Sequence, residues 1–94
     1  MVKVIVAHKV ADYDRWLPVF LEHGTVRRKH GATGHSVGRD VTDPNFIVIV
    51  NDFKTVAGAQ GFAQDPSLPE AMHKGGVEGH PQVWIVTEAD AARY

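Results

Sequence analysis

The chain has 94 residues, with ten Lys or Arg against eleven Asp or Glu, a net charge of −1 and no cysteine. This length predicts one domain, residues 1–94, whose small core would gain from burial against a second copy. The near-neutral charge argues against nucleic-acid binding. The absence of cysteine excludes a disulfide framework, a thiolate nucleophile and a Cys-based metal site.

The N-terminal residues alternate in the manner of a strand over residues 2–8, with Val4, Val6 and His8 on one face and Lys3 and Ile5 on the other. No long apolar segment or small-residue cleavage site precedes this strand. We therefore expect neither a signal peptide nor a membrane span, and a cytoplasmic location.

A helix is expected next, capped by Asp12 or Asp14 and ended by Gly31, with Pro18 tolerated only near its start. The only basic run of the chain, residues 27–30, falls at the end of this helix. We interpret it as a solvent-facing group of cations opposite the negative end of the helix dipole, and an anion site is the alternative.

Residues 33–39 and 46–53 read as two strands, joined by a turn at Asp43-Pro44-Asn45. In the first strand Gly34, Ser36 and Gly38 share a nearly bare face. The second strand is apolar on both faces, which is typical of a strand that is covered on both sides.

The last part of the chain predicts two short helices and a final strand. The first helix begins at Thr55 and stops at Asp65-Pro66, and the second begins with a capping box at Ser67 and ends at Gly75. Residues 79–81 are expected to form a loop, 82–87 the last strand, and about 89–94 a frayed tail.

This order of elements predicts an α+β, ferredoxin-like βαββαβ fold: a four-stranded antiparallel sheet with both helical segments on one face and the first and third strands central. The helices cover only one face, yet the third strand is apolar on both. We therefore expect a homodimer in which two sheets face each other around a two-fold axis.

At this point the chain resembles the dimeric α/β-barrel superfamily, especially the small antibiotic-biosynthesis-monooxygenase-like and cyclase-like proteins. The resemblance covers nearly the whole chain. It depends on residues in the first helix, in the hairpin and around the last helices: Asp12-Tyr13-Asp14-Arg15-Trp16, Phe20, Gly31, Gly34, Arg39-Asp40, Asp43-Pro44-Asn45, Phe62, Met72 and Gly76-Val77.

The resemblance implies a pocket between the helices and the sheet of each subunit, and a range of activities that includes cofactor-free oxygenases, isomerases and haem-degrading enzymes. The chain differs from two of these. The helix after the third strand has Phe62 but no Trp or Tyr as in the oxygenases, and the first strand lacks the Asn of haem-degrading relatives.

Histidines are the candidate catalytic residues, because an imidazole exchanges protons near neutral pH. The chain has six. We place His8, His35 and His73 as possible proton carriers; for each, a core, rim or helix-capping role is the alternative. His23 and His30 are expected to be solvated, and no spacing supports a metal site.

An apolar set is expected to face the sheet, either as core or as the wall of a substrate pocket. Its members are Trp16, Phe20, Phe62, Met72 and Trp84. Small residues at Gly34, Ser36, Gly38, Gly58 and Gly61 favour room for a planar ligand beside these rings.

Three functions stay open at this stage. The first is a cofactor-free homodimeric enzyme that acts by acid/base chemistry on a hydrophobic or aromatic carbonyl compound. The second is a non-catalytic ligand-binding or accessory module of the same fold. The third is haem binding through His73.

Overall fold

The structure, a computed structural model, describes residues 1–94. Its elements, in chain order, are β1 (Val2–Val10), α1 (Tyr13–Glu22), α2 (Gly24–Lys29), β2 (Ala32–Arg39), β3 (Phe46–Phe53), α3 (Val56–Ala63), α4 (Ser67–Lys74) and β4 (Val77–Thr87). The predicted ferredoxin-like order is confirmed, with each helical segment divided into two helices.

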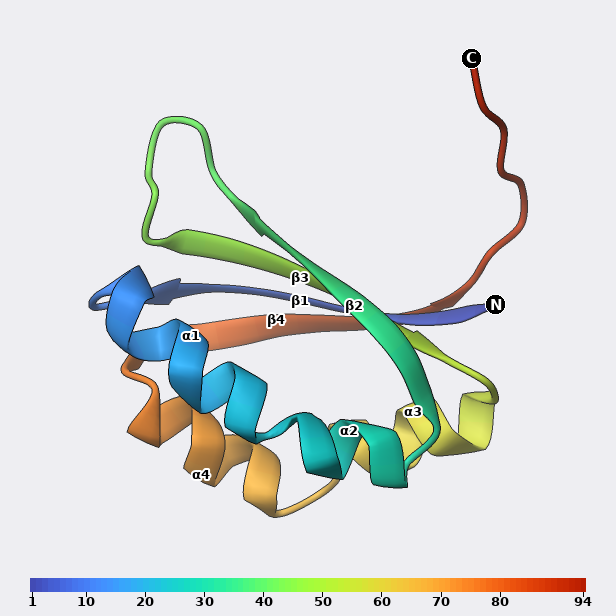
Figure 1. The fold of residues 1–94 in the computed structure, drawn as a ribbon, viewed down its shortest axis with the longest axis horizontal. Helices are drawn as coiled ribbons and strands as arrows, with labels where there is room; N and C mark the ends of the chain where they lie inside the picture. The colour runs from blue at the N-terminus through green and yellow to red at the C-terminus, as the bar shows by residue number, and fades with distance from the viewer.

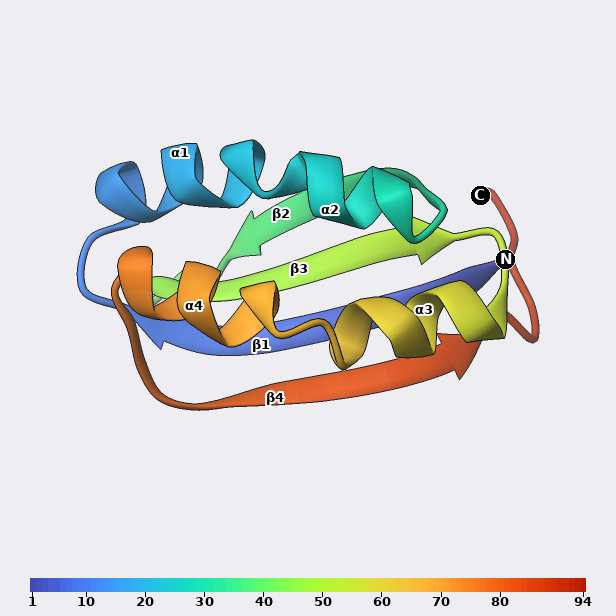
Figure 2. The same cartoon turned by 90° about the horizontal axis from the view of Figure 1, so that it is seen from below.

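The strands form one antiparallel sheet in the order β2-β3-β1-β4, so β1 and β3 are central as predicted. All four helices lie on one side of this sheet (Figure 1). Seen from the helical side, α1 and α2 lie toward β2 and β3, while α3 and α4 lie toward β1 and β4 (Figure 2).

The core lies between the helices and the two central strands. Val4 and Asn51 are paired across β1 and β3, and Val6 is paired with Ile49. These side chains point to the helices and are buried, as are Trp16 from α1 and Phe62 from α3. The alternating pattern of β1 thus marks its buried face correctly.

Helix α1 begins where the sequence predicts, because the Asp12 carboxylate accepts a hydrogen bond from the Asp14 amide at 2.9 Å. Pro18 lies in the interior of α1 rather than near its start, where the sequence predicted it. A break at His23 then separates α2, and this break turns Arg27 inward, where it is only 4% exposed. The prediction that the whole basic run faces water is therefore wrong for Arg27.

The prediction that His23 and His30, at the two ends of α2, are solvated is also wrong. The His23 ring is hydrogen-bonded to the Ser67 hydroxyl at 2.8 Å, and the His30 ring to the Asp65 carboxylate at 2.8 Å. Both contacts join α2 to the segment around the start of α4. This segment is therefore fastened to α2 by side-chain hydrogen bonds.

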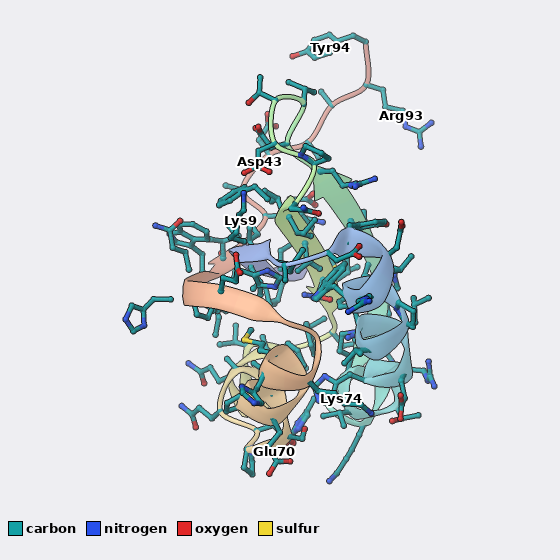
Figure 3. The ribbon with its side chains drawn as sticks, turned by 90° about the vertical axis from the view of Figure 1, so that its left-hand side faces the viewer. Lys9, Asp43, Glu70, Lys74, Arg93 and Tyr94 are labelled. Atoms are coloured by element: carbon teal, nitrogen blue, oxygen red, sulfur yellow. The ribbon has the colours of Figure 1, made fainter.

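The turn between β2 and β3 has the chemistry expected of its Asx residues. The Asp40 carboxylate accepts hydrogen bonds from the amides of Thr42 and Asp43, and the Asp43 carboxylate accepts one from the amide of Asn45. Asp43 also forms an ion pair with Lys9, which fastens the turn to the end of β1 (Figure 3).

Two local predictions near the C-terminus are wrong. No capping box forms at α4, because its N-cap is Pro66 and the Asp65 carboxylate binds the Ser67 amide instead. Residues 79–81 belong to β4 rather than to a loop. They are accommodated by a register shift in the pairing with residues 7–9 of β1 and by a positive φ of 70° at Gly79. No helix is long and apolar enough to cross a membrane.

The face of the sheet opposite the helices carries apolar side chains with nothing over them. Val48, Trp84 and Val86 are 37%, 46% and 40% exposed, and Ile5 and Val50 lie between them in the sheet. The hairpin after β2 and the C-terminal tail both rise on this side (Figure 1). An apolar sheet face of this kind is typical of a protein interface.

We predict that Gly58→Ala destabilises the fold although alanine is the better helix former. A Cβ at Gly58 would lie 2.2 Å from the His30 carbonyl oxygen, so α3 has to move away from α2. We expect a loss of about 2 kcal/mol in the free energy of unfolding, measured by urea denaturation.

Gly34→Ala is the matched control, because its Cβ would meet nothing within 4 Å. It should change stability by about 0.5 kcal/mol or less. Equal stabilities of the two variants would show that the close approach of α3 to the end of α2 is not a constraint.

Candidate functional site

A cavity lies between the helices and the central strands, with about 410 Å³ of empty space, part of which is open solvent. Its floor is formed by β1 and β3, its walls by α1 and α4, and its ends by α2 and α3. Nine of its thirteen lining residues are hydrophobic, which suits an apolar ligand. The four polar residues are His8, His23, Arg27 and Asn51.

His8 is a polar side chain of the cavity floor without a full set of partners. The residue is 4% exposed, and its ring meets Trp16 edge-on, with 5.7 Å between ring centroids. Its Nδ1 atom is buried and has no hydrogen-bond partner. Burial lowers the pKa of His8 below 6.5, so the ring is neutral at neutral pH.

Asn51 is the second polar residue of the floor, and it is 1% exposed. Its side-chain amide donates a hydrogen bond to the Val4 carbonyl oxygen at 3.2 Å, whereas its Oδ1 atom is buried without a partner. Because Asn51 is paired with Val4, it lies four residues from His8 along the sheet, a separation of about 13 Å.

These two unpartnered atoms are exceptional, because buried polar atoms in proteins nearly always have partners. Leaving one unpartnered costs about 1–3 kcal/mol. Between His8 and Asn51 the floor is made by Val6 and Ile49. The cavity therefore offers two hydrogen-bonding points separated by an apolar surface, which suits an elongated, flat, largely apolar ligand with a polar group at each end.

The wall over this floor is aromatic. Trp16 and Phe20 of α1 are stacked with 4.9 Å between ring centroids and 25° between planes. Phe62 of α3 lines the cavity together with Leu68 and Met72 from the second helical segment. The placement of Trp16, Phe20, Phe62 and Met72 beside one cavity agrees with the expectation from the sequence.

The end of the cavity near α2 is cationic. An Nη atom of Arg27 donates to the Phe20 carbonyl oxygen at 2.7 Å, and its guanidinium carbon lies 3.7 Å from the centroid of the Phe20 ring. Burial, and next the neighbouring Arg28, lower the pKa of Arg27 to about 10, so it stays charged at neutral pH. His23 lines the same end and is anchored by Ser67.

Three predicted site residues do not line the cavity. His35 lies on β2, with its ring edge against Phe20 at 4.9 Å between centroids, and lines a neighbouring hollow. His73 is exposed on α4, on the side away from the cavity lining. Trp84 is paired with Ile5, so both side chains face away from the helices, and Trp84 is 46% exposed. The prediction that Trp84 belongs to the core or to the pocket wall is wrong, because the strand register turns it to the face away from the helices.

The same register corrects the interpretation of the small residues. His35 and Val37 are paired with Asn51 and Ile49, so they face the helices, while Gly34, Ser36 and Gly38 face the other way. Gly58 and Gly61 are packed against His30 instead of bordering the cavity. The small residues therefore make no room for a ligand in this cavity.

Sequence reasoning missed Asn51, Arg27 and His23 as cavity residues. A signal for Asn51 was present, because it interrupts the apolar helix-facing side of β3 with a single amide. Arg27 carried no such signal, because its burial depends on the break between α1 and α2. No group of three His, Cys, Asp or Glu side chains comes together to hold a metal ion.

Haem binding depended on His73 as a ligand inside the pocket. The exposed position of His73, outside the cavity lining, leaves that interpretation without its ligand.

Comparisons with solved structures show the same fold in several proteins. A putative antibiotic biosynthesis monooxygenase from Bordetella bronchiseptica superposes with a TM-score of 0.75 at 17% identity, over 94% of this chain and 96% of that one. SnoaB, a cofactor-independent oxygenase from Streptomyces nogalater, superposes with a TM-score of 0.77 at 12% identity, over 96% of this chain and 94% of that one.

A third structure is a monooxygenase from the gene ActVA-Orf6 of Streptomyces coelicolor in complex with the ligand nanaomycin D. It gives a TM-score of 0.71 at 14% identity, over 99% of this chain and 91% of that one. Comparison with protein-family models and with curated proteins returns no match. The chain therefore has the ferredoxin-like fold of the antibiotic biosynthesis monooxygenase structures over nearly its full length.

We predict that the protein loses stability as the pH falls from about 7 to about 5. Burial lowers the pKa values of His8, His23 and His35 below 6.5 in the folded state. The unfolded chain then binds more protons than the folded one, so this contribution to stability is present above about 6.5 and is lost as the pH falls.

Thermal unfolding of the wild type and of His8→Gln at several pH values measures this dependence. The variant should show the shallower decrease, because one of the buried imidazoles is gone. His80→Gln, an exposed position on β4, is the control and should follow the wild type. A His8→Gln profile parallel to the wild type would contradict the assignment of a lowered pKa to His8.

Proposed function

We propose that the protein is a small cofactor-free enzyme that binds a flat, hydrophobic or aromatic carbonyl compound in the cavity and removes a proton from it with His8. The observation that carries this proposal is the buried Nδ1 atom of His8, which has no partner within the protein, on a residue that lines a mainly apolar cavity. A titratable group held neutral by burial in a cleft is typical of a general base.

The chemistry follows from the surroundings of the two polar ends. A neutral imidazole with a free nitrogen can accept a proton from an acidic C–H or O–H next to a conjugated carbonyl, leaving an enolate or phenolate. The Asn51 Oδ1 atom can only accept a hydrogen bond, so the ligand presents an O–H or N–H at that end. Trp16 and Phe20 hold the ring between these points.

The comparisons support this choice of ligand and reaction class without assigning them. One structure of this fold is a cofactor-independent oxygenase, and another holds nanaomycin D. Whether the reaction here continues to oxygenation, isomerisation or cyclisation depends on the carbanion's fate after His8 has taken the proton. The proposal itself is the proton transfer.

We propose in addition that the protein acts as a homodimer through the uncovered sheet face. The apolar side chains of Val48, Trp84 and Val86 are exposed there. The hairpin and the C-terminal tail extend on the same side of the sheet (Figure 1). A second copy is the occupant that offers the same apolar surface in return, and a two-fold axis makes the two patches complementary.

We predict that the protein accelerates hydrogen–deuterium exchange at the CH₂ group of anthrone, a flat aromatic carbonyl compound with an acidic C–H. Exchange followed by NMR in D₂O under argon reports proton transfer alone. His8→Gln should lower the protein-dependent rate at least about 100-fold, because it removes the base. Since deprotonated His8 is the active form, the rate should rise through a pKa below 6.5 and then level off.

His73→Gln is the matched control and should keep the wild-type rate, because His73 is exposed outside the cavity. Binding of anthrone without any exchange would favour the alternative of a ligand-binding module. Equal rates in wild type and His8→Gln would contradict the role of His8.

We predict that Trp84→Glu converts a dimer into a monomer of 10.3 kDa in sedimentation equilibrium at micromolar concentration. The carboxylate would have to be buried in the apolar interface, which costs several kcal/mol. Val56→Glu, a comparably exposed apolar position on α3, should leave the dimer intact. A wild type that sediments as a monomer would disprove the dimer.

A further inference from the structure

A second hollow, with about 580 Å³ of empty space that is partly open to solvent, lies between α2 and β2. Arg27, Arg28 and His35 line it together with the hydroxyl-bearing Thr33, and no Asp or Glu is among its lining residues. Figure 2 shows α2 lying over this edge of the sheet. The hollow therefore has three groups able to carry positive charge and none that carries negative charge.

Arg27 is the unusual member of this group. It is 4% exposed, yet none of the five ion pairs of the chain includes it. One of its nitrogens donates to the Phe20 carbonyl oxygen. A guanidinium has five N–H donors, so most of them are not used by this contact. A buried cation without an anionic partner is costly, and such groups are usually paired.

Arg28 increases this cost because its guanidinium converges on the same point. A Cβ built at Gly24 would lie 3.3 Å from an Nη atom of Arg27 and 3.4 Å from one of Arg28. Two cations thus share the space over one glycine, and Arg28 contributes to the lowered pKa of Arg27. An anion in the hollow would relieve this repulsion and use the free donors.

We propose that the hollow between α2 and β2 is a binding site for an oxyanion, a carboxylate or phosphate group, held by Arg27 and Arg28 with His35 and Thr33 at its edge. Planar guanidinium groups bind oxyanions through paired N–H donors, and the bond is strengthened by charge. Thr33 supplies a hydroxyl, and His35 a ring N–H.

The oxyanion has two possible sources, because Arg27 lines both the hollow and the main cavity. It is either a free anion in the hollow or the acidic group of the ligand in the cavity. Trp16 stacks on Phe20, and Arg27 lies over the Phe20 ring, so the aromatic wall leads directly to the cation. Only the second source depends on the proposed function.

The first arm of the test titrates the wild type with inorganic phosphate at constant ionic strength, with chloride as the balancing anion, and follows thermal unfolding. Phosphate should raise the Tm. In Arg28→Gln, about ten times more phosphate should be needed for the same rise in Tm. Arg28 is exposed, so its replacement leaves the core intact. Lys29→Gln is the control, because Lys29 is an exposed neighbouring cation outside the hollow. The phosphate concentration that this variant needs should stay within about twofold of the wild-type value.

The second arm compares anthraquinone-2-carboxylate with the uncharged 2-methylanthraquinone, by quenching of Trp16 fluorescence in a Trp84→Phe background. If the oxyanion belongs to the ligand, the carboxylate should bind about tenfold more tightly than the neutral compound, and Arg28→Gln should remove this preference. Binding of phosphate with no binding of either anthraquinone would support the anion site and count against the proposed function.

Two results would overturn the proposal. One is the absence of both a phosphate effect and a preference for the carboxylate. The other is an equal loss in Arg28→Gln and Lys29→Gln, which would show that only the general positive charge of α2 matters.

Discussion

The pairing of β1 with β3 is the interaction on which the rest of the structure depends. Their register places Val4 opposite Asn51 and Val6 opposite Ile49, and so decides which side chains face the helices. It puts His8 and Asn51 at two ends of one apolar floor. It also turns Ile5 and Val50 to the other side, where no helix covers them. A shift by one residue would exchange the two faces.

The helical layer completes the site by covering this floor with aromatic rings while leaving several polar groups without partners. His8 Nδ1, Asn51 Oδ1 and the charge of Arg27 are all buried with unmet interactions. Each of these groups lowers the stability of the fold. The stacking of Trp16 on Phe20 and the packing of Phe53 against Phe62 stabilise it. Concentration of unmet polar groups around one cavity is more simply explained by a ligand than by packing.

Much of the fold could be predicted from the sequence because it depends on local patterns. Alternation marks β1 and β3, Asp12 caps α1, and the Asx residues of the hairpin bind backbone amides as expected. The two-sided apolar character of β3 likewise indicates that the sheet carries apolar side chains on the face away from the helices as well. These features need no knowledge of distant contacts.

The site was less predictable because it depends on register and on breaks in helices. Trp84 and the face of Gly34, Ser36 and Gly38 were assigned to the wrong side, since alternation shows that two faces exist without showing which one the helices cover. The burial of Arg27 follows from the break at His23, which the single helix expected up to Gly31 does not include. His73 was misplaced because its neighbour Met72 takes the inward position on α4.

The central claim is that His8 holds a neutral imidazole with a free nitrogen at the cavity floor. Nitrogen-15 NMR of histidine-labelled protein, with His8→Gln to assign the signal, tests it most directly. The account predicts a His8 ring that stays neutral down to a pH below 6.5 and whose Nδ1 signal shifts when an anthrone fills the cavity. A ring that is protonated at neutral pH, or an Nδ1 signal indifferent to the ligand, would contradict it.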